Sequence, residues 1–171
     1  IPVLPICYYR DKVRKTIKWS TALSLFLYPI YPPQTTQTAH YCMAALADNN
    51  WLPLVDFRAP DEPVLYDSGA GVIIACGLLE TAEHVPSLEQ QMYRNADLRI
   101  LQACEERFAD WNLDSDGILF GGGMMYHKDK LAGQAYIYND YLLLEAILRL
   151  LGKHFTTFLK KALVYCKTSP L

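Results

Sequence analysis

The sequence lacks an excess of charge of either sign. Its 171 residues include 16 Lys and Arg against 18 Asp and Glu, which gives a formal net charge of −2 at pH 7. Proteins that bind nucleic acid without reading its sequence do so through a concentrated field of Lys and Arg. The bulk charge therefore predicts no nucleic-acid partner.

Cysteines are few, and they are not spaced as metal ligands are. Structural metal sites draw their cysteines from short, closely spaced motifs. The five cysteines here are scattered along the whole chain, at Cys7, Cys42, Cys76, Cys104 and Cys166. An odd number of cysteines without regular spacing is also untypical of a secreted domain that disulfide bonds stabilise. We expect a reduced, cytoplasmic protein with no metal site and no cofactor.

The sequence also lacks a hydrophobic run long enough to cross a bilayer. Residues 23–30 are apolar but fall well short of the roughly 20 residues that a spanning helix needs. The first residues, with Pro2 and Pro5 followed soon by charges, lack the apolar core of a signal peptide. We expect a soluble protein with no membrane contact.

Apolar residues are nevertheless abundant, at 51% of the chain, and residues 65–80 concentrate them. Asp67 and Ser68 precede the apolar run where side-chain oxygens would cap the first amides of a helix. Small residues alternate with bulky ones through the run, which permits close packing against several neighbours. A helix that is apolar nearly all round is typical of the interior of an all-α protein.

Residues 136–150 show the same arrangement. Asn139 and Asp140 stand at the expected cap and first turn, where a carboxylate meets the positive end of the helix dipole. Gly152 stands at the expected C-terminal stop. We predict an all-α fold in which this helix and the helix after Asp67 are neighbours on an inner ring.

The rest of the pattern divides the chain into three parts. Residues 1–35 form an irregular N-terminal segment, 36–152 a central helical part, and 153–171 a C-terminal helical tail. The central part is predicted to contain a helix at 36–48, a proline-rich loop to 65, a helix from 87 to about 110 and a short strand at 118–120. Ser87 and Gln90 are predicted to form a capping box at the start of the third of these elements.

Four short blocks of residues add a more specific signal, because their order and separations are those of one enzyme family. They read Asp56-Phe57-Arg58-Ala59-Pro60; Tyr66-Asp67-Ser68-Gly69-Ala70 running into Ala75-Cys76-Gly77-Leu78-Leu79-Glu80; Asp116-Gly117-Ile118-Leu119; and Tyr138-Asn139-Asp140-Tyr141 running into Glu145-Ala146-Ile147-Leu148-Arg149-Leu150. The resemblance that they carry covers about residues 37–151. Over this span the chain resembles the C-terminal half of the unsaturated glucuronyl hydrolases.

The resemblance implies an (α/α)6 barrel of six helical hairpins, of which this chain would form roughly the C-terminal half, with the active site among loops at one end. Enzymes of this family act on oligosaccharides left by polysaccharide lyases, whose terminal uronic acid carries a C4=C5 double bond. An aspartic acid protonates C4 while water adds at C5, and the resulting hemiketal opens to release the neighbouring sugar. The family's proton-donating aspartate belongs to the other half of the barrel, so we expect the catalytic residues to lie outside this chain.

The chain departs from the family pattern at several positions. Gly69 stands where the family usually has serine, and Leu142 where it usually has an aromatic residue. Around Trp19 only the Trp-Ser pair matches the family's motif. The segment before residue 36 therefore lies outside the resemblance.

Five residues are candidates for contact with the substrate. Tyr138 and Tyr141 flank the start of the second apolar helix, and tyrosine rings either stack on the apolar faces of sugars or pack in the core. Asp140, like Asp67, either contacts the substrate or simply caps its helix. His127 and Lys128 follow three glycines in a loop where the family recognises sulfate or carboxylate groups, although such a charged loop is often only solvated.

These observations predict a carbohydrate-active hydrolase, or a truncated remnant of one, that acts on unsaturated glucuronyl oligosaccharides. One alternative is a catalytically inactive helical module that needs a partner chain. Another is an unsaturated rhamnogalacturonyl hydrolase or a sugar epimerase on the same barrel. Half a barrel would leave apolar faces uncovered, so we expect a homodimer or a partner chain that completes the barrel. Tyr8, Trp19, Phe26 and residues 155–163 are candidates for that contact.

Overall fold

The computed structural model describes residues 32–57, 62–123 and 133–153, and within them it is all-helical. Four α-helices follow one another along the chain: α3 (Pro32–Ala47), α4 (Ser68–Ala82), α5 (Ser87–Phe108) and α6 (Ile137–Leu150). Extended pairing among these residues is limited to isolated bridges. The prediction of an all-α fold is confirmed, whereas the strand predicted at 118–120 is reduced to a single bridge between Leu119 and Ala109.

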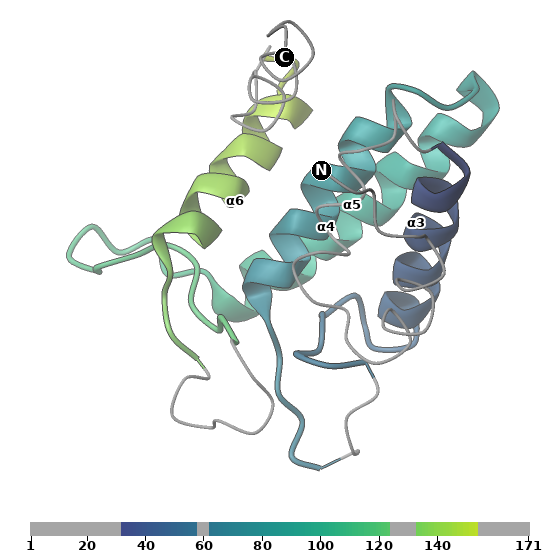
Figure 1. The fold of residues 1–171 in the computed structure, drawn as a ribbon. Coiled ribbons are helices and arrows are strands. Elements are labelled where there is room, and N and C mark those ends of the chain that lie inside the picture. The colour runs from purple at the N-terminus through teal and green to yellow at the C-terminus, as the bar shows by residue number, and fades with distance from the viewer. Residues whose placement is uncertain (1–31, 58–61, 124–132, 154–171) are drawn as a thin grey trace, which may run out of the picture.

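Helix α4 lies at the centre of the described part. All of its residues except Ala70 are buried, and α3, α5 and α6 all pack against it (Figure 1). Its small residues permit this close packing. At Gly71, for example, a Cβ atom would lie 2.6 Å from the sulfur of Cys104 in α5 and 3.0 Å from the ring of Pro53.

Helices α4 and α5 form an antiparallel hairpin, but the capping box predicted at the start of α5 is wrong. Ser87 is already the first residue of α5, and Pro86 occupies the cap position without a side-chain hydrogen bond. Proline suits this end of a helix because the amide that it lacks would have no partner there. The Gln90 side chain donates instead to the carbonyl oxygen of Val85, at 3.2 Å.

Helix α3 begins earlier than predicted, at Pro32 rather than residue 36. Prolines are tolerated in the first turn of a helix, where the amide has no partner within the helix in any case. Pro32 and Pro33 therefore form the first turn of the helix. Buried side chains of α3, among them Ala39, Cys42 and Leu46, join the main hydrophobic core.

Helix α6 packs on α4 on the side away from α3, so the predicted neighbours are indeed neighbours (Figure 1). The helix begins at Ile137, with Tyr136 at the cap, so Asn139 lies within the helix and is not its cap. Its end matches the prediction. Gly152 has a φ of +68°, its amide donates to the carbonyl of Arg149, and the amide of Lys153 donates to that of Leu148, which is a Schellman motif.

None of the helices described combines the length and the apolarity that a membrane span needs. The N-terminal segment up to residue 31, most of the C-terminal tail and the residues proposed above for contact with a partner lie outside the described residues.

Candidate functional site

Asp67 holds the start of α4 to a loop more than 50 residues away. Its Oδ1 atom accepts hydrogen bonds from the amides of Ala70 and Gly123, each at 3.2 Å, so it is the N-cap that the sequence predicts. Burial raises the pKa of the Asp67 carboxyl, while the amides of Gly123, Ala70 and Gly69 act in the opposite direction. The cap thus also fixes the glycine-rich loop beside the helix N-terminus.

Asp140 performs a similar task from α6. Its carboxylate accepts the amides of Ile118, at 3.1 Å, and Leu119, at 2.8 Å. The side chain therefore caps no amide of its own helix but holds the loop between α5 and α6 in place. Contact of Asp140 with a substrate stays a prediction, and the geometry gives this residue a positioning role.

The loop that these two carboxylates hold runs through Gly121, Gly122 and Gly123, and each glycine lies against a side chain. A Cβ atom at Gly121 would lie 2.4 Å from the ring of Phe108, and one at Gly122 would lie 2.5 Å from the ring of Tyr136. A Cβ at Gly123 would lie 2.4 Å from the side chain of Val55. Real Cβ atoms do not approach neighbours so closely, so glycine lets the loop pass directly against these groups.

Two stacked tyrosines lie at the start of α6. The rings of Tyr136 and Tyr138 are parallel to within 6°, with centroids 5.1 Å apart. Burial, and after it the negative charge of Asp67, raises the pKa of Tyr138 to about 12. Tyr138 thus keeps its hydroxyl proton at neutral pH, and its ring lies face to face with that of Tyr136.

A second aromatic group lies at the end of α5. The guanidinium of Arg107 lies 4.5 Å from the centroid of the Tyr66 ring, and the rings of Tyr66 and Phe108 are 6.0 Å apart. We did not predict this group from the sequence, because Tyr66 lies 41 residues before Arg107 and 42 before Phe108. The stacked pair of Tyr136 and Tyr138, in contrast, could have been predicted, because the two tyrosines are only two residues apart in the sequence.

The structure separates the predicted site residues. Tyr138 and Asp140 both lie in the first turn of α6 and face the loops. Tyr141 lies on the outer side of α6 and is 42% exposed, in line with Ile137 and Leu144. His127 and Lys128 lie outside the described residues, so their contact with a substrate stays a prediction.

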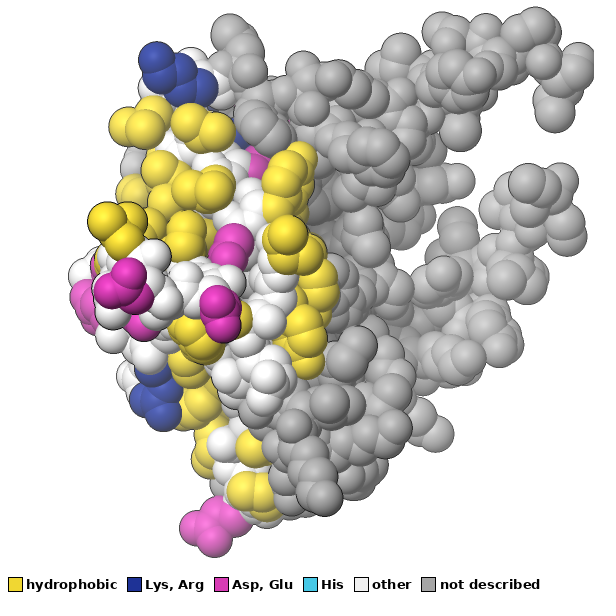
Figure 2. Space-filling view, turned by 90° about the vertical axis from the view of Figure 1, so that its left-hand side faces the viewer, with side chains coloured by type: hydrophobic (Ala, Val, Ile, Leu, Met, Phe, Trp, Pro, Cys, Tyr) yellow, Lys and Arg dark blue, Asp and Glu magenta, His cyan; other side chains and the backbone are white. Residues whose placement is uncertain are grey.

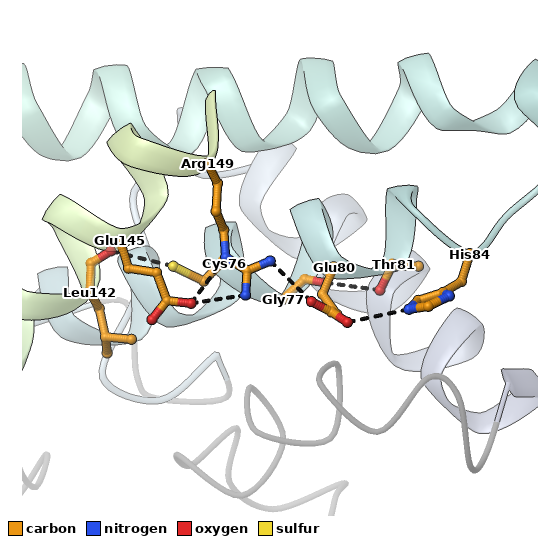
Figure 3. Close-up of polar contacts among 8 residues, drawn as sticks. All are labelled: Cys76, Gly77, Glu80, Thr81, His84, Leu142, Glu145 and Arg149. Carbon is orange, nitrogen blue, oxygen red and sulfur yellow. Dashed lines mark hydrogen bonds and ion pairs between the residues drawn. The ribbon is translucent and has the colours of Figure 1, made fainter. Parts of the chain in front are cut away.

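Further along α4 and α6, two buried carboxylates share one guanidinium (Figure 3). Arg149 reaches Glu80 and Glu145, each at 3.0 Å, and the side chains of Arg149, Glu80 and Glu145 are 7%, 3% and 0% exposed. Burial alone would lower the pKa of Arg149, but the hydrogen bond to Glu80 and the charges of both glutamates raise it above its usual value. We call Glu80, Glu145 and Arg149 the buried ion triad.

One group of side chains near this triad has the donor types of a metal site. Donor atoms of Glu80, Glu83 and His84 lie within 4.8 Å of one another. The carboxylate of Glu80 already bonds to Arg149 at 3.0 Å and to His84 at 3.2 Å. A guanidinium on the same carboxylate opposes a second cation, so we interpret the group as an extension of the ion triad.

Comparison with known proteins gives this arrangement a family context. No protein-family model matches the chain. An unsaturated glucuronyl hydrolase from Bacillus sp. (strain GL1) is 36% identical over 101 residues, which cover 56% of this chain and 26% of the relative. An unsaturated chondroitin disaccharide hydrolase from Streptococcus pneumoniae (strain ATCC BAA-255 / R6) is 30% identical over 86 residues, or 48% of this chain and 22% of the relative.

Solved structures extend the likeness to the fold. The crystal structure of the unsaturated glucuronyl hydrolase from Bacillus sp. GL1, described as responsible for the degradation of glycosaminoglycan, matches 77% of this chain with a TM-score of 0.66 and 26% identity. An unsaturated glucuronyl hydrolase from Streptococcus agalactiae matches 77% with a TM-score of 0.63. At 22% identity, the second comparison shows the fold alone.

The chain spans only part of these proteins, about a quarter of the curated Bacillus relative and 36% of the solved one. Within that part, the all-helical fold agrees with the expectation from sequence. In sequence and in fold, the chain thus resembles the unsaturated glucuronyl hydrolases, whose (α/α)6 barrel it shares in part.

Proposed function

We propose that the chain is part of a hydrolase that removes unsaturated glucuronyl residues from oligosaccharides by hydration of the C4=C5 double bond, and that it supplies sugar-binding loops to the reaction. The observation that carries this proposal is the stacked Tyr136–Tyr138 pair, held beside Asp67 at the loop end of a fold similar to that of unsaturated glucuronyl hydrolases. The outer face of such a pair is an apolar aromatic surface on which the apolar face of a sugar ring can stack.

The polar groups around the pair support a binding role. Asp67 and Asp140 are acceptors for backbone amides, so they hold the two loops against α4 and α6 at fixed positions. A sugar-binding site needs such rigid support, because ordering a mobile site on binding costs free energy and so weakens the affinity. We assign the proton donor to neither carboxylate, in keeping with the resemblance, which implies that the donor lies outside this chain.

Binding and turnover of an unsaturated chondroitin disaccharide test the proposal separately. Saturation-transfer NMR should show contact between the disaccharide and the full chain. Tyr138→Ala should weaken that contact about tenfold, since a stacked ring contributes roughly 1–2 kcal/mol. Tyr41→Ala removes a tyrosine that is 46% exposed on α3 and should leave binding unchanged. Equal binding by both variants would contradict the assignment of Tyr138.

Turnover is followed as the loss of absorbance of the conjugated double bond. We expect the chain alone to be slower than a complete enzyme by about two to four orders of magnitude, because it lacks the general acid. Rapid turnover that Asp67→Asn or Asp140→Asn abolishes would place the acid in this chain instead. A chain that neither binds nor hydrates the disaccharide would favour the inactive helical module.

A further inference from the structure

The guanidinium of Arg107 lies over two aromatic rings at the C-terminal end of α5. Its central carbon is 4.5 Å from the centroid of the Tyr66 ring and 5.8 Å from that of the Phe108 ring. The two rings are tilted by 56° to each other. Both distances are within the range in which an aromatic face attracts a cation. The rings therefore hold the charged group in place, and we call Arg107, Tyr66 and Phe108 the arginine cluster.

The charge of Arg107 is not matched by a carboxylate in the part of the chain that the structure describes. Arg107 is exposed, and the ion pairs among the described residues all lie in or beside the buried ion triad. Two glutamates come just before Arg107 in the sequence, but they bond to neutral side chains. Glu105 accepts the indole N–H of Trp111 at 3.1 Å, and Glu106 accepts the amide of Gln102 at 2.8 Å. The N–H donors of Arg107 are thus open to an anion from solution.

The arginine cluster and the stacked tyrosine pair flank the same glycine loop. The ring of Phe108 lies 2.4 Å from where a Cβ of Gly121 would be, and the ring of Tyr136 lies 2.5 Å from that of Gly122. Tyr66 belongs to this loop end too, because its carbonyl oxygen lies 3.0 Å from where the Cβ of the third glycine would be. Since the glycines follow one another, the cation and the aromatic pair are neighbours across one short loop.

The other Lys and Arg side chains of the described part lie elsewhere. Arg149 belongs to the buried ion triad, and Lys153 follows the end of α6. Arg94 and Arg99 lie eight or more residues before Arg107 on α5. Figure 2 looks at the side of the molecule that carries α6, and Lys and Arg side chains are sparse there among hydrophobic ones. An anion that approaches the glycine loop would therefore meet Arg107 as its cation.

The substrate of the proposed function is itself an anion, because a glucuronyl residue carries a carboxylate and a sulfated sugar adds a sulfate. The planar fork of N–H donors on arginine matches two oxygens of either group. We propose that Arg107 binds an anionic group of the oligosaccharide that stacks on the tyrosine pair, and so determines a preference for charged substrates. This inference rests on the proposed function and adds a specificity-determining residue to it.

A purely structural role for Arg107 makes a different prediction. Arg107 lies in the last turn of α5, where the helix dipole favours a cation. Loss of that interaction would lower the stability of the chain and affect every ligand alike. Loss of a binding residue would weaken charged ligands alone, and high salt would hide the loss, because dissolved ions screen an exposed charge.

Three probes separate these roles on the full chain: the unsaturated chondroitin disaccharide, a sulfated form of it, and the methyl ester of the unsulfated form, which is neutral. Isothermal titration calorimetry measures each dissociation constant. Arg107→Gln should weaken at least one charged probe about tenfold, because a hydrogen bond between charged groups is lost, and should leave the methyl ester unchanged. A loss with the unsulfated disaccharide identifies the carboxylate, and a loss with the sulfated form alone identifies the sulfate. The loss should shrink in about 1 M salt.

Arg99→Gln is the matched control. Arg99 is exposed on the same helix, and its guanidinium also lies over an aromatic ring, 5.3 Å from the centroid of Trp51. This variant should leave all three dissociation constants unchanged. Arg107→Lys keeps the charge without the planar fork and should retain part of the affinity. If Arg107→Gln fails to fold, as judged by circular dichroism, Arg107→Met replaces it, because methionine keeps an apolar stem over the two rings.

Equal weakening of all three probes by Arg107→Gln would overturn the inference in favour of a structural role. Unchanged affinity for both charged probes would overturn it as well, and so would an equal loss in Arg99→Gln. A wild-type chain that binds none of the probes would contradict the proposed function itself. A wild-type chain that binds them and an Arg107→Gln variant that binds them equally well would contradict only the role of Arg107.

Discussion

The sequence predicts that α4 and α6 are both inner helices, but α4 is buried on all sides and α6 on one. Helix α4 is covered by α3, α5 and α6, and all its residues but Ala70 are buried. In α6 only Asn139, Leu143, Glu145 and Ala146 are buried. An all-round apolar pattern thus indicates that a helix will be covered, but it does not identify which element covers it.

The two flanks of α4 also differ in how buried charge is treated. Toward α6, the ion triad places two carboxylates on one guanidinium. Toward α5, Asp97 is fully buried, and among the described residues neither of its carboxylate oxygens has a hydrogen-bond partner. The stability of the chain should therefore depend on every member of the ion triad on the first flank. On the second flank, stability should depend on pH through the protonation of Asp97.

Loss of the cation from the triad has the largest expected effect. Arg149→Leu leaves Glu80 and Glu145 buried together without their cation, and breaking a buried pair in this way typically costs about 3–5 kcal/mol. Urea denaturation measures the free energy of unfolding. The triple variant Arg149→Leu, Glu80→Gln, Glu145→Gln removes all three charges and should recover most of the loss. A cost below about 1 kcal/mol for the single variant would mean that water reaches the two carboxylates.

Titration of Asp97 has the next largest expected effect. Burial raises the pKa of the Asp97 carboxyl to about 8, although the charge of Arg94 acts to lower it. The folded chain keeps this proton up to about pH 8, whereas the unfolded chain releases it near pH 4. The free energy of unfolding therefore falls as pH rises from about 4 to about 8, by up to about 1.4 kcal/mol per pH unit.

Asp97→Asn removes the ionisable group, so its stability should not fall over that range, and it should exceed the wild type most at pH 9. Denaturation at pH 5, 7 and 9 measures the difference. Asp114→Asn, at an exposed position, should follow the wild-type profile. Parallel profiles for Asp97→Asn and the wild type would show that the carboxyl finds a partner in solution.

Features determined by neighbouring residues could be predicted from the sequence. The cap at Asp67 and the stop at Gly152 each depend on a few residues along the chain, and both are confirmed. The capping box at Ser87 failed because Pro86 took the cap position and moved the helix start by one residue.

Features that join distant segments could not be predicted. Arg149 meets Glu80 across 69 residues, and Asp140 meets the amide of Ile118 across 22. Nothing in either local sequence marks these partners. Tyr138 and Asp140 lie at the start of α6, as the sequence predicts, but the hydrogen bonds by which Asp140 holds the loop at Ile118 were not predicted. Their contact with a substrate stays a prediction.

The close approach of α4 and α6 should be measurable at Gly69, with a moderate effect. A Cβ atom there would lie 2.4 Å from Oδ1 of Asn139, so Gly69→Ala forces the helices or the side chain to shift. We expect a cost of about 1–3 kcal/mol, even though alanine favours helix more than glycine does. In a double-mutant cycle, Asn139→Ala should relieve at least about 0.5 kcal/mol of that cost. A stabilising Gly69→Ala would show that α6 moves away from α4 readily.

The end of α6 gives the smallest effect, and it isolates backbone conformation from packing. Gly152 has a φ of +68°, and no heavy atom lies within 4 Å of where its Cβ would be. Gly152→Ala should therefore lower the free energy of unfolding by about 1 kcal/mol, the strain of alanine in the left-handed conformation. Gly152→Asn should lower it less, because asparagine tolerates that region.

Gly133 is the matched control in a loop, because its φ is +81° and its surroundings are equally open. Gly133→Ala should destabilise the chain in thermal unfolding by a similar amount. It should not reduce the helical circular dichroism signal, whereas Gly152→Ala should, because the end of α6 then frays. If Gly152→Ala has no effect on either measurement, the Schellman turn does not fix the end of α6 in solution.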